Sequence, residues 1–158
     1  RAPLHASMAE IDRVLAEKRG WIESHLRKSQ ARQAQAKNVR PFTLEELNAL
    51  ADQALAYIPE RVRIYAEKLG VRYHRITIRN QRTRWGSCSA KGNLNFNCLL
   101  MLTPPEVIDS VVVHELCHLL EMNHSDRFYR EVYRVFPEYD KCNAWLKEHG
   151  PELMARLR

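Results

Sequence analysis

Hydrophobic residues recur at helical spacing in several segments of the chain, and a capping-box pattern precedes three of these segments, at residues 7–10, 43–46 and 103–106. The first predicts a helix whose apolar stripe ends near residue 27 and whose continuation to residue 37 is polar. The second predicts a helix that kinks or restarts at Pro59 and ends at Gly70. The third opens a helix that is apolar over most of its surface, so we expect it to be buried.

The remaining pattern predicts two strands and two further helices. Residues 71–79 and 93–101 alternate between apolar and polar positions, as strands with one exposed face do, and a polar loop joins them. Ser125 is expected to cap a helix that ends near residue 136. A last helix is expected from residue 138 to a stop at Gly150.

The composition is that of a globular chain of about one domain's length, with 45% hydrophobic and 28% charged residues. It excludes a disordered or collagen-like chain. No apolar run approaches the roughly 18 residues of a membrane-spanning helix, so we expect no membrane partner.

The net charge of +6 is unevenly distributed: residues 1–40 carry +5, residues 41–103 carry +4 and residues 104–158 carry −3. The basic front of the chain predicts an anionic partner. For residues 1–40, a solvated helix surface rich in arginine is the alternative.

None of the four cysteines forms a C-x-x-C pair, so the sequence contains no zinc-ribbon or thioredoxin-like pattern. The absence of a secretory signal favours reduced, mostly buried thiols and a cytoplasmic location. The chain begins at Arg1 without an initiator methionine, so we expect its natural N-terminus to lie upstream.

The strongest candidate for chemistry is the H-E-L-C-H sequence at residues 114–118, within the buried helix. His114 and His118 are four residues apart, so their imidazoles lie on one helix face and can bind one ion. Glu115 lies about 100° further round the helix, beside the ion. This arrangement is typical of a zinc site whose carboxylate takes a proton from zinc-bound water. Two ordinary helical histidines are the alternative, but they are costly to bury unpaired.

The third metal ligand is expected beyond the helix. His124 lies six residues after His118, past a turn for which Asn123 is a candidate left-handed residue. Glu138 is the alternative ligand. Glu121 is expected near the site or on the surface, and Cys117 is expected to pack as a small apolar group.

These residues, with the R-W-G-S-C sequence at residues 84–88 and the strand at 93–100, resemble the YgjP-like metallopeptidase family, which is related to the SprT-like and WLM zincins. The resemblance covers nearly the whole chain. It implies an α+β fold with a zincin-like minimal core, in which an active-site helix and supporting helices pack against a small, mainly antiparallel sheet. It also implies a catalytic domain at residues 41–158 after a basic helical segment at residues 1–40. Residues 1–4 are similar to the end of a β-rich N-terminal segment.

The resemblance further implies an edge strand that binds extended peptide, and residues 93–97 are expected to form it. Arg84, Asn93 and Asn95 are the resulting candidates for substrate binding. An oxyanion-stabilising donor is also needed. The unranked candidates for it are Arg84, Tyr129, Tyr133 and Tyr139; packing within helices is the alternative role of each tyrosine.

Three functions follow from the sequence. The first is a zinc-dependent hydrolase, a metallopeptidase acting on unfolded peptide or protein. The second is a metal-dependent nucleoside triphosphate pyrophosphatase, because five arginines between residues 72 and 84 suit phosphate and some members of the resembled family are described as acting on UTP. The third is a basic nucleic-acid-binding domain with structural zinc.

Overall fold

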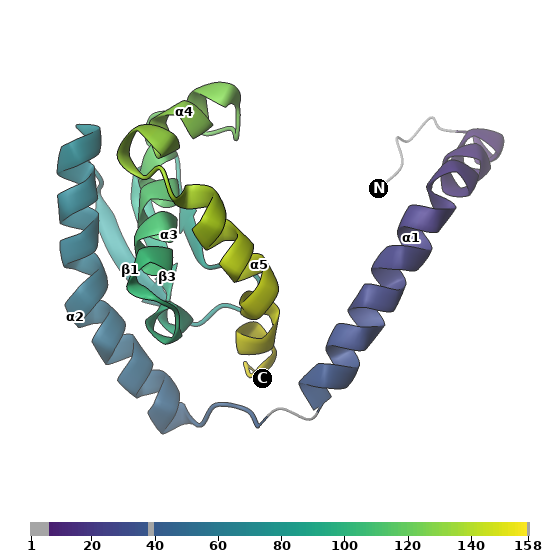
Figure 1. Cartoon of the computed structure of the whole chain (residues 1–158), viewed down its shortest axis with the longest axis horizontal. Helices are drawn as coiled ribbons and strands as arrows, with labels where there is room; N and C mark the ends of the chain where they lie inside the picture. The colour runs from purple at the N-terminus through teal and green to yellow at the C-terminus, as the bar shows by residue number, and fades with distance from the viewer. Residues whose placement is uncertain (1–6, 38–39, 158) are drawn as a thin grey trace. The chain divides into compact units, whose positions relative to one another are not determined.

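The computed structural model describes residues 7–37 and 40–157, and its contacts divide the chain into two units, Arg1–Val39 and Arg40–Arg158. Within the described residues, the first unit consists of one helix, and the second contains the other helices and the strands (Figure 1). Residues 1–4, for which the resemblance implies the end of a β-rich segment, lie outside the described residues.

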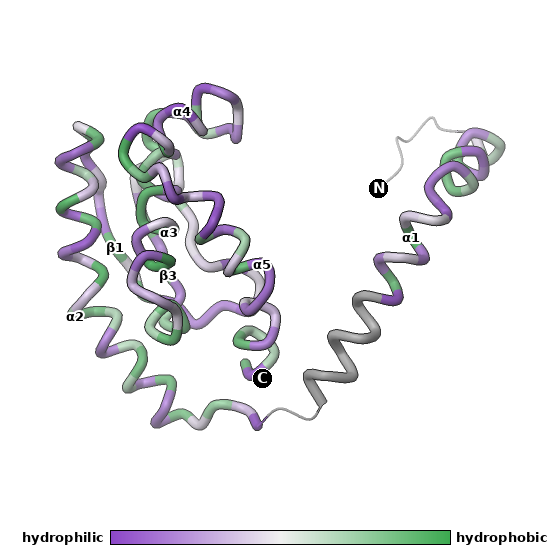
Figure 2. The backbone as a smooth tube through the Cα atoms, in the orientation of Figure 1, coloured by the Kyte–Doolittle hydropathy of each residue, from purple (hydrophilic) through white to green (hydrophobic). Residues whose placement is uncertain are grey.

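Helix α1 (Met8–Lys37) begins where the first capping box predicts, and the Ser7 hydroxyl accepts a hydrogen bond from the Glu10 N–H at 3.2 Å. Hydrophobic and hydrophilic residues are interspersed along the part of α1 that Figure 2 colours. Side chains of its predicted apolar stripe are exposed, among them Trp21 and Leu26. Neither α1 nor another helix of the described residues is long and apolar enough to cross a membrane.

Helix α2 (Leu44–Leu69) has both ends that the sequence predicts. The Thr43 hydroxyl accepts from the Glu46 N–H, and the Glu46 carboxylate accepts from the Thr43 N–H, which completes the capping box. At the other end, Gly70 has a φ of 70°, a left-handed conformation that glycine adopts without steric penalty. The helix continues through Pro59, so the prediction of a restart there is wrong.

The sheet contains β1 (Arg75–Arg79), β2 (Gly86–Cys88) and β3 (Asn93–Asn97) in the order β1-β3-β2. Strand β1 is parallel to β3, and β2 is antiparallel to β3. The α+β class with a small sheet is confirmed. The sheet is mixed rather than mainly antiparallel because the connection at residues 80–85 and the β2–β3 hairpin each reverse the chain, so β3 runs in the direction of β1.

The central position of β3 contradicts the expectation that residues 93–97 form an edge strand. Both sides of β3 pair with a neighbouring strand, which occupies the backbone groups that a substrate would need. Strand β2 is an edge strand instead. The sequence predicts a loop at these residues, because three residues that begin with glycine are too few to show an alternating pattern.

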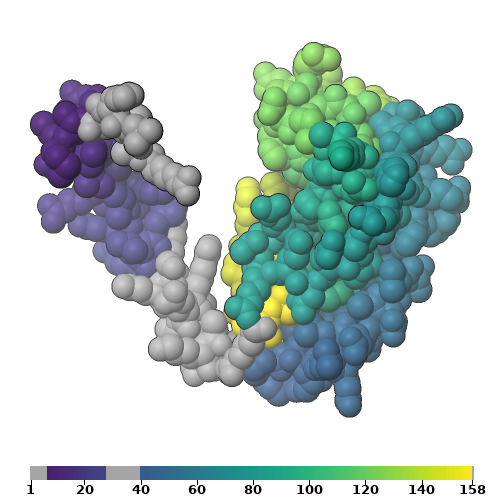
Figure 3. Space-filling view, turned by 180° about the vertical axis from the view of Figure 1, so that it is seen from behind, coloured from purple at the N-terminus to yellow at the C-terminus, as the bar shows by residue number. Residues whose placement is uncertain are grey.

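The segments after the sheet enclose the core of the second unit. A short 3₁₀ helix (Cys98–Leu102) leads to α3 (Pro105–Cys117), which is buried over most of its length. Helices α4 (Asp126–Val135) and α5 (Tyr139–Ala155) follow. Helix α3 lies in front of the sheet in Figure 1, between α2 and α5. In the view from behind, the teal part of the chain that contains the strands faces the viewer (Figure 3).

A partly buried ion pair fixes α3 against α2. The Asp109 carboxylate accepts two hydrogen bonds from the Arg61 guanidinium, at 2.7 and 2.6 Å, and one from the Tyr65 hydroxyl at 3.1 Å. The bond to Asp109 raises the pKa of Arg61. Because Arg61 and Tyr65, both on α2, are held by the same carboxylate, α3 has a defined position on α2.

The beginning of α3 differs in detail from the predicted capping box. Pro104 is the N-cap residue, and no side chain caps the helix there. The Thr103 hydroxyl instead donates to the Leu100 carbonyl at 2.8 Å. Proline in the first turn needs no amide partner, so the helix begins without the expected side-chain cap.

Helix α5 continues through Pro151, so the predicted stop at Gly150 is wrong. Gly150 is buried, and a Cβ atom at this position would lie 3.0 Å from the Trp85 ring. Close packing against Trp85, rather than helix termination, therefore explains this glycine.

The two ends of the second unit are joined to each other. The Phe42 N–H donates to the Arg156 carbonyl at 3.1 Å, and the Arg156 guanidinium lies 3.7 Å from the centre of the Phe42 ring. The next residue, Leu157, is buried in the core. The C-terminal segment therefore belongs to the folded unit.

Candidate metal centre and active site

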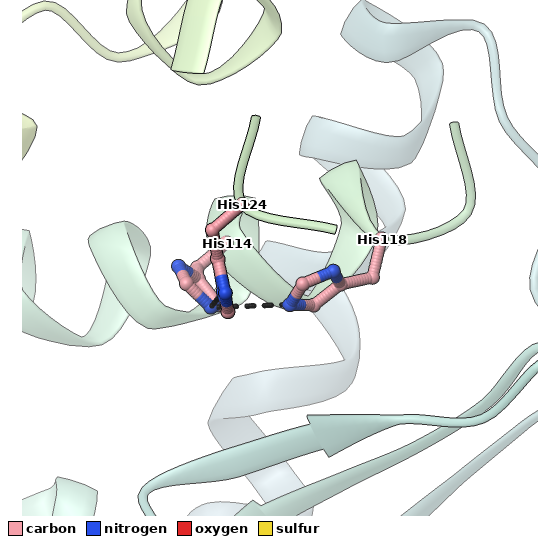
Figure 4. Close-up of side chains that lie close together, drawn as sticks. All are labelled: His114, His118 and His124. Atoms are coloured by element: carbon pink, nitrogen blue, oxygen red, sulfur yellow. Dashed lines mark hydrogen bonds between the residues drawn. The ribbon is translucent and has the colours of Figure 1, made fainter. Parts of the chain in front are cut away.

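The three predicted metal ligands lie together at the C-terminal end of α3. His114 is in the last turn of the helix, His118 is its C-cap, and His124 precedes α4. The Nε2 atom of His114 lies 3.2 Å from the His118 Nε2 atom and 3.0 Å from the His124 Nε2 atom. Figure 4 shows the three rings turned toward one another. Within residues 7–27 and 40–157, no other group of three or more histidine, cysteine or acidic residues converges in this way.

The three nitrogens fit a zinc ion. Tetrahedral coordination with Zn–N bonds of about 2.0–2.1 Å separates ligand nitrogens by about 3.3–3.4 Å, and the observed separations of 3.0 and 3.2 Å are close to this value. Three protein ligands leave one coordination position for water or substrate. This number is typical of catalytic zinc sites, whereas structural sites have four protein ligands.

Hydrogen bonds at the Nδ1 atoms fix two of the rings. The His114 Nδ1 atom lies 2.8 Å from the Tyr139 hydroxyl, and the His118 Nδ1 atom lies 3.2 Å from the Glu121 carbonyl oxygen. When each Nδ1–H donates, the Nε2 lone pair is free to bind a metal. Burial, and then the charges of His118 and His124, lower the pKa of His114 to about 4. This ring is therefore neutral at pH 7, the form that metal binding requires.

Phe128 contacts all three candidate ligands. Its ring centre lies 4.9 Å from His114, 4.7 Å from His118 and 4.9 Å from His124, and its side chain is fully buried. Helix α4 brings it there, because the predicted cap Ser125 accepts a hydrogen bond from the Phe128 N–H at 3.5 Å. Phe128 therefore links the hydrophobic core to the three rings.

The alternatives considered for the third ligand lie elsewhere. Glu138 is exposed and is not part of the converging group. The backbone carbonyl of Glu121 lies within hydrogen-bonding distance of the His118 ring. Cys117 is fully buried in the core, and burial raises the pKa of its thiol to about 12.

No described non-glycine residue has a positive φ, so the prediction that Asn123 is left-handed is wrong.

Glu115, the predicted proton acceptor, is only 5% exposed. Burial raises its pKa to about 8, and the nearby positive charge of Arg84 acts in the opposite direction. A carboxyl group with such a pKa takes up and releases a proton near neutral pH, as a general base must.

Glu115 and His114 line a cavity of about 270 Å³. The segment of residues 83–86 and helices α3 and α5 form its walls, and Trp85, Val111 and Leu146 are its large apolar side chains. A cavity of this size, with one of the three candidate ligands in its wall, can hold part of a substrate.

The predicted substrate-binding residues lie in two different places. Arg84 lines the cavity. Asn93 and Asn95 do not line it; their side-chain amides donate to Ser89 at 3.3 Å and to Ser87 at 3.1 Å. Their side chains therefore link β3 to β2 and to the turn between these two strands.

The three tyrosines considered as oxyanion donors also differ in position. Tyr139 lines the cavity and bonds to His114. Tyr133 is exposed and donates to Asp140 at 3.0 Å. Tyr129 is half-buried and packs against the hydrophobic core. Of the three, only Tyr139 reaches both the cavity and a candidate ligand.

Gly86, the first residue of β2, contacts Glu115 in a way that the sequence does not predict. A Cβ atom at this position would lie 2.6 Å from the Glu115 Oε1 atom, so the β2 backbone directly adjoins the carboxylate. The R-W-G-S-C sequence at residues 84–88 carries part of the family resemblance and so indicates that this region is functional. Nothing in its spacing relative to Glu115 predicts that the two touch.

Comparison with known proteins agrees with this site. Residues 43–149 match a family model described as YgjP-like, metallopeptidase domain. The crystal structure of the metallopeptidase zymogen abylysin from Pyrococcus abyssi is similar with a TM-score of 0.52 and 23% identity, over 58% of this chain and 93% of that chain. The zymogen jannalysin from Methanocaldococcus jannaschii is similar with a TM-score of 0.52 and 22% identity, over 58% and 94%.

These two structures show a shared fold. No match was found among curated proteins. The family model covers well over half of the chain and includes every candidate ligand. The protein therefore belongs to the YgjP-like metallopeptidase family.

Proposed function

We propose that the chain is a zinc-dependent metallopeptidase that hydrolyses extended peptide segments, with residues 41–158 as its catalytic domain. One observation carries the proposal: three histidine Nε2 atoms converge at the end of α3, and one of these histidines, His114, lines the same cavity as the buried Glu115 side chain. Membership of a metallopeptidase family supports it.

His114, His118 and His124 would hold the zinc ion. When bound, zinc supplies a Lewis acid that polarises a substrate carbonyl and makes a water molecule more acidic. The Glu115 carboxylate accepts the proton of the attacking water at a carboxylate oxygen. It then donates this proton to the nitrogen of the leaving amine.

The free edge of β2 supports binding of an extended peptide. The Trp85 carbonyl and the Ser89 N–H bond to β3, at 2.8 and 3.0 Å. Backbone groups of alternate residues point to the same side of a strand, so those of Gly86 and Cys88 point away from β3. A peptide that pairs with these groups passes directly beside Glu115. This strand replaces residues 93–97 in the substrate-binding role.

Arg84 is the proposed substrate-binding side chain of the cavity wall. Of the five arginines between residues 72 and 84, it is the one that lines the cavity, while Arg75 and Arg79 lie on β1 at the opposite edge of the sheet. The arginines are therefore not gathered around the candidate metal site, so the phosphate-binding alternative receives no support from their arrangement.

The variant Glu115→Gln tests the proposal. We expect it to retain zinc, measured by elemental analysis, and to lose turnover of an unfolded protein substrate by at least about a thousandfold, because the proton acceptor is absent. Glu138→Gln is the matched control, since this exposed residue should change neither zinc content nor turnover.

The same preparations should be assayed with a chelator and with a panel of nucleoside triphosphates. Loss of peptide hydrolysis on chelation and recovery on addition of zinc are expected. Full activity of Glu115→Gln, or release of pyrophosphate without peptide hydrolysis, would contradict the proposal.

A further inference from the structure

We infer that Gly86 is a positioning residue for Glu115: the missing side chain at residue 86 leaves the space in which the Glu115 carboxyl group lies. The inference rests on the proposed function for its catalytic consequence, but its structural part stands separately. A Cβ atom at residue 86 would lie 2.6 Å from Oε1, 2.7 Å from Cγ and 2.9 Å from Cδ of Glu115. Real side chains do not tolerate such distances, so any other residue at this position displaces one of the two partners.

Backbone conformation does not explain this glycine. Positive φ angles occur at Gly70 and Gly92 among the described glycines, and Gly86 is not among them. Gly86 lies in a strand, where glycine is unfavourable because it loses conformational entropy and contributes no side chain to packing. The close approach of Glu115 therefore provides the physical reason for glycine at residue 86.

The β2 backbone is not free to move away from Glu115. On the strand side, the Asn97 N–H donates to the Trp85 carbonyl at 2.8 Å. The buried Asn97 side-chain amide donates to the Gln81 carbonyl at 2.6 Å and to the Arg84 carbonyl at 2.9 Å, which fixes the segment before β2. The Trp85 ring is in turn packed closely against Gly150 of α5.

The backbone of α3 is also restrained, by the partly buried pair of Asp109 and Arg61 six residues before Glu115. The Glu115 side chain is the remaining part that can rotate. We therefore expect a methyl group at residue 86 to turn the carboxyl group away from β2, the strand on which the substrate is proposed to pair.

Gly86→Ala tests this inference. A shift of about 1 Å in a catalytic group reduces turnover by about a hundredfold, so we expect kcat to fall by about that factor. The backbone groups of residue 86 remain for substrate pairing, so KM should change less than threefold. Zinc content and the visible spectrum of the Co²⁺-loaded protein should be unchanged, because the histidines are not touched. Gly20→Ala on α1, where the new methyl group meets nothing within 4 Å, is the control.

A double-mutant cycle separates positioning from a general effect on the fold. If Gly86 acts through the Glu115 carboxylate, Gly86→Ala in the Glu115→Gln background should lower kcat less than threefold further. If Gly86 acts through the fold or through substrate pairing, the hundredfold factor should appear in both backgrounds. That multiplicative result would overturn the inference.

Thermal unfolding gives a second test that needs no activity. Glu115→Ala removes Cγ, Cδ and Oε1, the three atoms that a residue-86 methyl group would meet. Gly86→Ala should therefore lower Tm by several degrees in the wild-type background and leave Tm unchanged, or raise it, in the Glu115→Ala background. If Gly86→Ala alone does not fold, Gly86→Ala/Glu115→Ala should fold.

Equal losses of Tm in the two backgrounds would contradict the inference even if the proposed function is correct. Conversely, a fully active Glu115→Gln variant together with recovery of Tm in the Glu115→Ala background would refute the proposed function and leave the steric relation intact.

Discussion

The two sides of the candidate site are built in different ways. The histidine side (His114, His118, His124 and Phe128) comes from one short stretch of chain, in which a helix end, a turn and the next helix bring the rings together. The strand side (Arg84, Gly86 and Asn97) comes from the sheet and reaches Glu115 only because β2 packs against α3.

This difference separates two functions of the scaffold. On the histidine side, hydrogen bonds and ring contacts hold the three rings that would bind a metal. On the strand side, backbone pairing and a missing side chain fix where the carboxyl group lies relative to a peptide. Variants on the histidine side should therefore change metal affinity, and variants on the strand side should change turnover at constant metal affinity.

The largest effect is expected for His118→Ala. Removing one of three ligands should weaken zinc binding well beyond the roughly 100-fold that partners outside the ligand set contribute, and activity should be lost at limiting zinc. Competition with a chromophoric chelator measures the affinity. His149→Ala on α5, an exposed histidine, should bind zinc normally; equal affinities of all three proteins would disprove the ligand set.

On the strand side, Asn97→Ala should give the next largest effect. The buried amide donates to two carbonyls, and leaving these unpaired should lower the free energy of unfolding by about 2–3 kcal/mol. Urea unfolding measures this change, and kcat should fall while zinc affinity stays constant. Asn80→Ala, at an exposed position, serves for comparison. A weakened zinc site in Asn97→Ala would break the separation of the two sides.

Tyr139→Phe should weaken zinc binding by about 10–100-fold, because the His114 ring loses its Nδ1 partner. Tyr133→Phe removes a similar hydroxyl that bonds to Asp140 on the surface and should have no effect on zinc. Chelator competition again gives the affinities. If both variants bind zinc as the wild type does, the hydroxyl of Tyr139 does not orient the ligand.

The smallest effect is a pH dependence of stability in the metal-free protein. Burial raises the pKa of Glu115 from 4.5 to about 8, so above pH 6.5 the unfolded chain has lost a proton that the folded chain retains. The free energy of unfolding should fall from pH 6.5 to 8, by at most about 2 kcal/mol. Below pH 6.5, protonation of His114 in the unfolded chain opposes this trend, since its folded pKa is about 4.

Glu115→Gln should remove this pH dependence, because the amide does not titrate. Urea unfolding of metal-free wild type and variant at several pH values between 6.5 and 8 makes the comparison. Identical slopes for both proteins would show that another group is responsible.

The histidine side could be predicted from the sequence because its chemistry is encoded by short-range spacing. Residues four apart on a helix must share a face, and Ser125 marks where the next helix begins after the turn. The same reasoning located α2 from Thr43 to Gly70, where caps at both ends are local signals.

The strand side could not be predicted in this way, because it depends on which strands pair. Alternation identified β1 and β3, but gave no order, so the strand rich in asparagine was assigned to an edge although β1 and β2 flank it. Gly150 was interpreted as a helix stop although its role is to accommodate Trp85. A glycine that is required for close approach and a glycine that ends a helix are indistinguishable until the neighbouring element is known.

The contact between Phe42 and Arg156 has a practical consequence for the design of a minimal enzyme. A fragment cut at the limits of the family match, residues 43–149, would end inside α5 and would lack Leu157 together with both members of this contact. Recombinant fragments should instead span residues 40–157, so that the first and last segments of the second unit can still contact one another.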